Sequence, residues 1–278
     1  MLYYDILLDI CNIIDDILLL RTISFVSQLW KEAVHHSTIG KFLLLSPTEC
    51  FESEDPYFGL FEWGCKNGHL DLLKWIYQCE AYQTSDIYDY DDLNFYVEQE
   101  LFQTTCFHNQ FQVAQWLHQT FEINLDIIPK FTIFDHLCTN NLLPFAKWFR
   151  SLVNIQYYDL YKTNFEAFIG ACSNGHLTMV QWLHKKFQLN TDHLRFMQMI
   201  PFQAACENGY FQVAMWLQLT FDFKEPDIRK KNDLALRLAK QNDHKKIVEW
   251  LHLLLQMKMK KFLRPRQLRR RRSLSIYF

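Results

Sequence analysis

Residues 171–183 read Ala171-Cys-Ser-Asn-Gly-His-Leu-Thr-Met-Val-Gln-Trp-Leu183, and closely similar stretches lie at residues 64–76 and 205–217. Each stretch ends in a tryptophan that is followed by an apolar residue. Tryptophans recur at Trp75, Trp116, Trp148, Trp182, Trp216 and Trp250, with gaps of 41, 32, 34, 34 and 34 residues. A nearly fixed period of this size indicates a stack of structural repeats.

Equivalent positions around each tryptophan carry equivalent types of residue. Phenylalanine stands fourteen residues before it in five copies: Phe61, Phe102, Phe134, Phe168 and Phe202. Cysteine stands ten residues before it in the same five: Cys65, Cys106, Cys138, Cys172 and Cys206. Types that tolerate left-handed backbone stand seven residues before all six: Gly68, Asn109, Asn141, Gly175, Gly209 and Asp243. We predict a tight turn there.

Apolar residues follow a spacing of 3 to 4 on both sides of the predicted turn. This spacing is helical, so each copy is predicted to be a helix, a tight turn and a second helix. Neither helix can bury its apolar stripe alone, so neighbouring copies must stack, and we expect the six tryptophan rings to be enclosed within the stack.

The segments 64–70, 171–177 and 205–211 resemble the middle of an ankyrin repeat, where two small residues precede a Gly-His turn and an apolar helix follows. The resemblance covers residues 59–257 and implies an all-α, ankyrin-type helical solenoid of about six repeats. Tetratricopeptide repeats share the period, but their tryptophan precedes their glycine, and here the order is reversed. The Thr-Pro-Leu-His opening of an ankyrin repeat is missing, so we expect short or irregular connections between copies.

Residues 1–45 do not fit this period. Apolar residues at helical spacing, beginning with Leu2, predict one helix, and Asp15-Asp16 can cap a second. Together with Val26-Ser-Gln-Leu-Trp30, the segment loosely resembles an F-box, although the proline of the family's opening is absent. The alternative is a small helical module that caps the first repeat. Residues 46–58 would then be a linker.

The F-box resemblance implies a docking surface for the Skp-type adaptor of a cullin–RING ubiquitin ligase. The positions that match the family's apolar docking face are Leu2, Ile6, Leu7, Ile10, Val26 and Trp30. An F-box before ankyrin-like repeats resembles proteins common in large DNA viruses of amoebae. That combination implies a viral protein engaged in host–virus interaction.

Residues 258–278 form a basic tail with nine lysines and arginines between Lys258 and Arg272 and no acidic residue. The rest of the chain then holds 20 basic against 31 acidic residues, a net charge of −11. The tail is either a solvated segment or a nuclear-import or polyanion-binding signal. Nucleic-acid binding as the main function is disfavoured, because the acidic body repels phosphate.

Composition excludes several classes of protein. A hydrophobic content of 49% and an aromatic content of 16% indicate a folded chain. No apolar run reaches the roughly 18 residues of a membrane span, and residues 1–20 contain four aspartates and no basic residue, unlike a secretory signal. We therefore expect an intracellular protein without membrane contact, cytoplasmic or, through its tail, nuclear.

Candidate reactive groups do not converge on one site. Cys65 with His69 and Cys172 with His176 have metal-ligand spacing, but they belong to separate copies, whereas the ligands of zinc must converge within about 2.3 Å of the ion. Equivalent cysteines about 10 Å apart are also too distant for disulfides. There is no Gly-rich phosphate loop and no hydrolase motif. We expect no enzyme, no metal and no cofactor.

The residue two before each predicted turn varies between copies, and we predict that these residues form a partner-binding face. They are Lys66, Phe107, Thr139, Ser173, Glu207 and Gln241. The alternative is ordinary drift of surface residues. The sequence favours a protein–protein interaction scaffold, with recruitment of a substrate to a ubiquitin ligase as its use. Sequestration or inhibition of a host factor, and polyanion binding through the tail, stay open.

Overall fold

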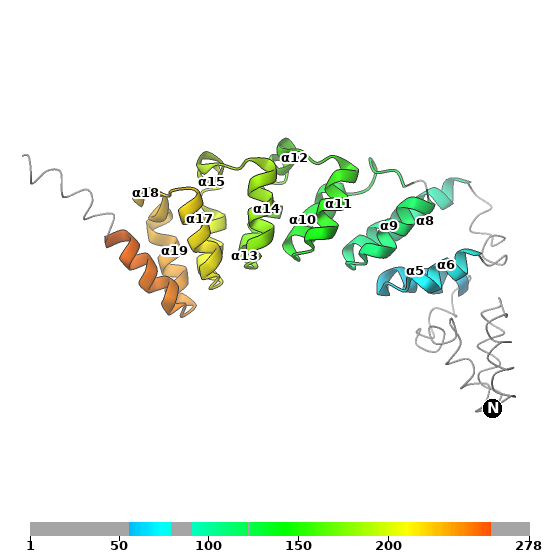
Figure 1. Ribbon diagram of the computed structural model, residues 1–278, viewed down its shortest axis with the longest axis horizontal. Coiled ribbons are helices and arrows are strands. Elements are labelled where there is room, and N and C mark those ends of the chain that lie inside the picture. Colours follow the sequence, from blue (N-terminus) through cyan, green and yellow to red (C-terminus); the bar gives the residue numbers. More distant parts are fainter. Residues whose placement is uncertain (1–55, 79–90, 122, 257–278) are drawn as a thin grey trace, which may run out of the picture. The chain divides into compact units, whose positions relative to one another are not determined.

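The computed structural model describes residues 56–78, 91–121 and 123–256, and every regular element in these ranges is a helix (Figure 1). Five helix pairs follow one another: α5 (Pro56–Asn67) with α6 (Leu70–Gln78), α8 (Asp91–Phe107) with α9 (Phe111–Thr120), α10 (Lys130–Thr139) with α11 (Leu143–Val153), α13 (Glu166–Ser173) with α14 (Leu177–Phe187), and α16 (Ile200–Glu207) with α17 (Phe211–Thr220). The sixth is α19 (Lys230–Gln241) with the helical residues 245–256. The predicted all-α class is confirmed for these ranges.

The chain divides into two compact units, unit 1 up to Lys130 and unit 2 from Phe131 onward. In each unit, the first helices of successive pairs pack against each other. In unit 1, α5 packs on α8; in unit 2, α13 packs on α16 and α16 on α19 (Figure 1). Second helices also contact the next second helix, as α14 does α17. Each apolar stripe is thus covered by a neighbouring pair.

The turn inside each pair lies where the sequence predicts it. All six predicted turn residues have a positive φ, which ranges from 56° at Asp243 to 82° at Gly209. Glycine reaches this backbone region freely, and asparagine and aspartate tolerate it better than other residues. The prediction of a left-handed turn in each pair is therefore confirmed at every copy.

The core is built from the repeated phenylalanines and cysteines. The five phenylalanines are at most 1% exposed, and the five cysteines are fully buried and free. The equivalent residues of the last pair, Leu236 and Lys240, are half-buried and exposed. The six tryptophans are only half-buried, so an expectation that their indoles are enclosed in the core is wrong. The wide indole covers the edge of the junction and keeps one side in solvent.

Three of the six tryptophans, Trp116, Trp182 and Trp250, nevertheless have equivalent neighbours. The phenylalanine of one pair lies against the tryptophan of the next: the ring centroids are 6.2 Å apart for Phe61 and Trp116 and 6.3 Å apart for Phe202 and Trp250. Phe134 and Trp182 have the same relation at 6.2 Å. The same aromatic contact therefore joins successive pairs in both units.

Short helices connect the later pairs, where we expected short or irregular segments. These connectors are α12 (Tyr157–Lys162), α15 (Thr191–Phe196) and α18 (Glu225–Ile228). Two apolar residues anchor each one: Ile155 and Leu160, Leu189 and Leu194, and Phe223 and Ile228, all at most 3% exposed. Each connector is thus packed into unit 2 through its own buried residues. The predicted N-terminal module, residues 46–55 of the predicted linker and the basic tail lie outside the described residues. The rest of that linker, residues 56–58, is helical and belongs to α5, so the first helix pair begins three residues before the predicted start of the repeats.

Candidate interaction surface

A row of asparagine side chains crosses the junctions between pairs. The side-chain amide of Asn174 donates to the carbonyl of Thr139 at 3.0 Å, and that of Asn208 donates to the carbonyl of Ser173 at 2.8 Å. Asn242 repeats the bond to the carbonyl of Glu207 at 2.7 Å. Each bond satisfies a carbonyl near the end of a first helix, where no intrahelical donor remains. The row fixes the register of successive pairs.

The turn glycines also receive a side chain from the next pair. A Cβ built on Gly175 would come within 2.2 Å of the Tyr210 ring, and one on Gly209 would come within 2.6 Å of the His244 ring. The Nε2 atom of His244 also donates to the Glu207 carbonyl at 2.8 Å, since that carbonyl can only accept. Glycine is needed here for close approach as well as for its backbone conformation.

The six residues that we predicted as a partner-binding face lie at the ends of the first helices. Only Gln241 is exposed, and the other five are half-buried. Thr139 packs closely against the next pair: a Cβ built on Gly170, in α13, would lie only 2.2 Å from the Oγ1 atom of Thr139. Lys66 pairs with Glu62 at 2.7 Å in its own helix, and its carbonyl accepts a bond from Gln110. The backbone carbonyls of Lys66, Thr139, Ser173 and Glu207 each accept a bond from the next pair, so the structure places these four residues where pairs join.

The connectors begin with a shared capping bond. The third helical residue accepts the backbone N–H of the N-cap: Asp159 from Gln156 at 2.9 Å, and Asp227 from Lys224 at 2.9 Å. In α15 the acceptor is the Nδ1 atom of His193, 3.0 Å from the backbone nitrogen of Asn190. Nδ1 can accept only while it carries no proton. Burial lowers the pKa of His193, although the nearby Asp192 carboxylate opposes that shift.

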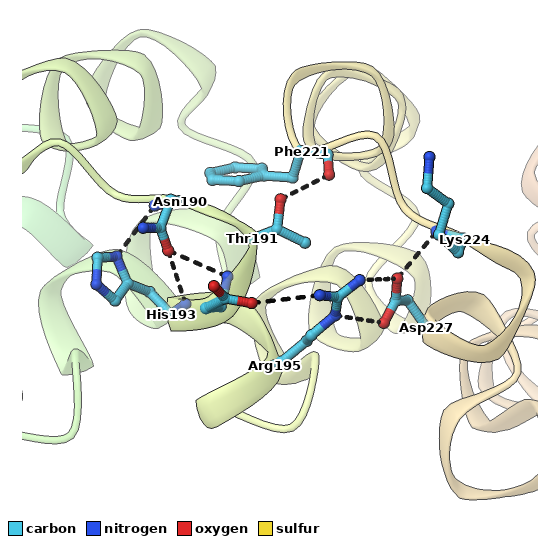
Figure 2. Close-up of polar contacts among 8 residues, drawn as sticks. Asn190, Thr191, His193, Arg195, Phe221, Lys224 and Asp227 are labelled. Atoms are coloured by element: carbon cyan, nitrogen blue, oxygen red, sulfur yellow. Dashed lines mark hydrogen bonds and ion pairs between the residues drawn. The ribbon is translucent and has the colours of Figure 1, made fainter.

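Polar contacts hold α15 to the connector that follows it (Figure 2). Asp227, which is 9% exposed, accepts from the Nε and Nη2 atoms of Arg195 at 2.9 and 3.1 Å. The hydroxyl of Thr191 donates to the backbone carbonyl of Phe221 at 2.8 Å. Bidentate pairing fixes the angle of the guanidinium as well as its position. The Arg195–Asp227 pair thus joins α15 to α18, and the Thr191 bond joins α15 to the end of α17.

Aromatic contacts hold α12 to α15. The rings of Tyr157 and His193 lie 4.8 Å apart, and those of Tyr161 and Phe196 lie 5.1 Å apart. Tyr158 stacks with Tyr161 at 6.5 Å. We call Tyr158, Tyr161 and Phe196 the connector aromatic cluster. These three residues are 63%, 44% and 54% exposed, in that order, whereas the phenylalanines of the core are buried.

A carboxylate caps the first helix of the fourth pair. Asp135, on α10, accepts the backbone N–H of Ala167 at 3.1 Å. Burial raises the pKa of Asp135 to about 7, while the bonds from Ala167 and Thr163 lower it and Glu166 raises it further. This contact ties the start of α13 to the preceding pair.

The repeated cysteines have the chemistry of core residues. Burial raises the pKa of Cys65 to about 12 and raises those of the other four as well. Thiolate is the reactive form of cysteine, so these thiols are poor nucleophiles at neutral pH. Within 56–78, 91–121 and 123–256, no three His, Cys, Asp or Glu side chains are grouped as metal ligands. None of the helices in those ranges could cross a membrane.

No family model, curated protein or solved structure matches the chain. The predicted adaptor-docking residues Leu2, Ile6, Leu7, Ile10, Val26 and Trp30 all lie outside the described residues. The positions that the structure itself brings together are the junction asparagines and the connectors.

Sequence reasoning missed the asparagine row, although its signal is present. Asparagine stands eight residues before the tryptophan in five copies: Asn67, Asn140, Asn174, Asn208 and Asn242. The last three form the row, whereas Asn67 and Asn140 donate to the carbonyls of Trp63 and His136, four residues earlier. A polar residue repeated at one position indicates a backbone bond as readily as a binding site, and only the structure identifies its acceptor. The connector aromatic cluster has no periodic signal, since Tyr158 and Phe196 do not occupy equivalent positions.

Proposed function

We propose that this chain is a protein–protein interaction scaffold built of ankyrin-type repeats, with the helix pairs as repeats and the connectors as its binding surface. The recurring phenylalanine–tryptophan contact and the asparagine row support the repeat architecture. In such arrays each repeat contacts only its neighbours, which leaves a long edge available to a partner.

The connector aromatic cluster is the observation that carries this proposal. Three aromatic rings from two connectors contact one another and yet are each more than 40% exposed. Grouped exposed aromatic side chains commonly mark an interaction site, and tyrosine is enriched among the residues that dominate binding energy. Lys162 lies over the Tyr158 ring at 4.9 Å, which adds a positive charge to the rim of the cluster.

Affinity purification with matched variants tests the proposal. We expect full-length protein carrying Tyr158→Ser and Phe196→Ser to lose proteins that the wild type retains from cells expressing it. A control carrying Leu219→Ser and Leu253→Ser removes two residues that are 67% and 56% exposed but lie outside the connectors. The control should retain the same proteins. If both variants retain them equally, the connectors are not the binding surface.

Recruitment of a substrate to a ubiquitin ligase is the use that the F-box resemblance favours. We propose that a Skp-type adaptor binds residues 1–45, and the support for this is the sequence alone. Full-length protein should capture the purified adaptor, and Ile6→Asp with Ile10→Asp should abolish capture while leaving proteins bound at the connectors unaffected. Failure of the wild type to bind the adaptor would leave a stand-alone scaffold, which sequesters or inhibits a host factor.

The basic tail supports a third use, as a nuclear or polyanion-binding signal. Its nine basic residues within 258–272 contrast with the acidic remainder of the chain. Deletion of residues 258–278 should then change cellular location or remove polyanion binding. Unchanged location and unchanged partners would assign the tail to solvation.

A further inference from the structure

A basic pocket of about 390 Å³ lies in unit 2, beside the connector aromatic cluster. Arg150 at the end of α11 and Lys186 at the end of α14 supply its positive charge. Tyr157, Phe187 and His193 supply aromatic walls, and two glutamines complete the lining. None of the described residues that line it is acidic.

The two cations of the pocket are not neutralised by the described part of the chain. Neither Arg150 nor Lys186 forms an ion pair with any described residue, although nine such pairs occur elsewhere in those ranges. The Nε atom of Arg150 is buried and has no hydrogen-bond partner within the described ranges. Its guanidinium carbon lies 5.4 Å from the centre of the Phe187 ring, which holds the side chain in place.

His193 adds a hydrogen-bond donor to the lining of the pocket, and the tautomer of its ring is fixed. Its Nδ1 atom accepts the N–H of Asn190, so the neutral ring carries its proton on Nε2. The ring is held against Tyr157 at 4.8 Å. The pocket thus combines two cations with a donor that packing positions, and such a set is complementary to a carboxylate.

The pocket and the connector aromatic cluster form one strip. Tyr157, which lines the pocket, directly precedes Tyr158 of the cluster in α12. Beneath them the buried ring of Phe165 lies 6.3 Å from His193 and 6.2 Å from Tyr161. A partner segment across the strip would place an apolar residue on the cluster and an acidic residue in the pocket. Asp159 and Asp192, on the two connectors beside the pocket, are each paired with a basic residue, at 3.6 and 3.2 Å. The acidic remainder of the chain disfavours a nucleic acid, which carries a phosphate at every nucleotide.

We propose that this pocket binds a glutamate or aspartate side chain of an acidic segment in a protein partner. The proposal rests on the scaffold function and adds the chemistry of the partner. Arg150 and Lys186 pair with the carboxylate, and the aromatic walls reduce competition from water.

Peptide binding to the full-length protein tests this pocket directly. The probe is hexaglutamate labelled with a neutral dye, and its binding is followed by fluorescence anisotropy at physiological salt. Arg150→Gln with Lys186→Gln should weaken binding at least about tenfold, as expected for losing two contacts to charged groups. The control is Lys147→Gln with Lys185→Gln, which removes the same charge from the same two helices outside the pocket. It should weaken binding less than about threefold. Because the nine basic residues of the tail would also bind hexaglutamate, the same comparison is made in proteins that lack residues 258–278, and the ratio of affinities there decides.

Equal binding by the two double variants would overturn the proposal and leave the scaffold function untouched, since that function is tested by partner retention through Tyr158 and Phe196. A labelled oligothymidine that binds in a pocket-dependent way, more tightly than hexaglutamate, would also overturn it in favour of nucleic acid. If the double variant fails to fold, Lys186→Gln against Lys185→Gln decides the question, because both lysines are exposed.

Discussion

Single residues at the turns and helix starts determine how one pair meets the next. Gly175 combines a φ of 76° with direct contact from Tyr210, whereas Asn141 adopts the same backbone region with its own side chain. Asp135 reaches from one pair to the first helix of the next. These positions turn a repeated sequence into a defined junction.

Replacing a turn glycine should destabilise the fold more than introducing one. We expect Gly175→Ala to lower the free energy of unfolding by about 1–3 kcal/mol, because an alanine Cβ is strained in left-handed backbone and collides with Tyr210. Asn141→Gly should change it by less than about 1 kcal/mol. Urea unfolding measures both values. A Gly175→Ala effect that is unchanged in a Tyr210→Ala background would show that the ring contact contributes nothing.

Asp135 should make unit 2 less stable as the pH rises toward 7. The pKa of Asp135 is raised from 3.8 to about 7, so the folded state holds a proton that the unfolded state releases. The stability is therefore fully present below pH 4 and is lost through pH 7, with a slope of up to about 1.4 kcal/mol per pH unit. Asp135→Asn should remove this contribution, as measured by urea unfolding between pH 4.5 and 8. Parallel curves for the two proteins would contradict the assignment.

The helices themselves follow from the sequence to different degrees. The pairs were predictable, because apolar residues at helical spacing on both sides of a turn residue identify two amphipathic helices. The connectors were not, since α12, α15 and α18 are four to six residues long and have too few turns for a periodic signal. Their stability comes from buried anchors such as Leu194 and from capping bonds, which only three-dimensional contacts reveal.

The cap of α15 should respond to acid in a way that the other connectors do not. The pKa of His193 is lowered, so the unfolded chain takes up a proton near pH 6.5 before the folded chain does. Its cap contributes stability above pH 6.5 that is lost as the pH falls toward the folded pKa. His193→Asp supplies the carboxylate found in α12 and α18, and it should abolish this loss. Thermal unfolding from pH 7.5 to 5.0 measures the difference in stability between the wild type and His193→Asp. Asp135 titrates in both proteins, so its contribution cancels. An equal acid response in both proteins would contradict a neutral cap.

At the scale of the whole molecule, neighbouring helix pairs within each unit meet through repeated contacts. Sequence reasoning located the six turns and the buried phenylalanines, but it misplaced the tryptophans, which cover the junctions while half-buried. It also predicted recognition at Thr139 and Glu207, whose backbone carbonyls the structure places inside junctions. Repetition marks packing and binding positions alike, and only the contacts separate the two.

Fluorine NMR of protein labelled with 5-fluorotryptophan tests the repeated junction most directly. Phe134→Leu should shift the resonance of Trp182, in the next pair, because the two rings lie 6.2 Å apart. Phe202→Leu should likewise shift that of Trp250. Each resonance is assigned from a single Trp→Phe variant. If each phenylalanine substitution instead shifts the tryptophan of its own pair, Trp148 or Trp216, and leaves the next pair's resonance in place, the helix pairs do not join as described.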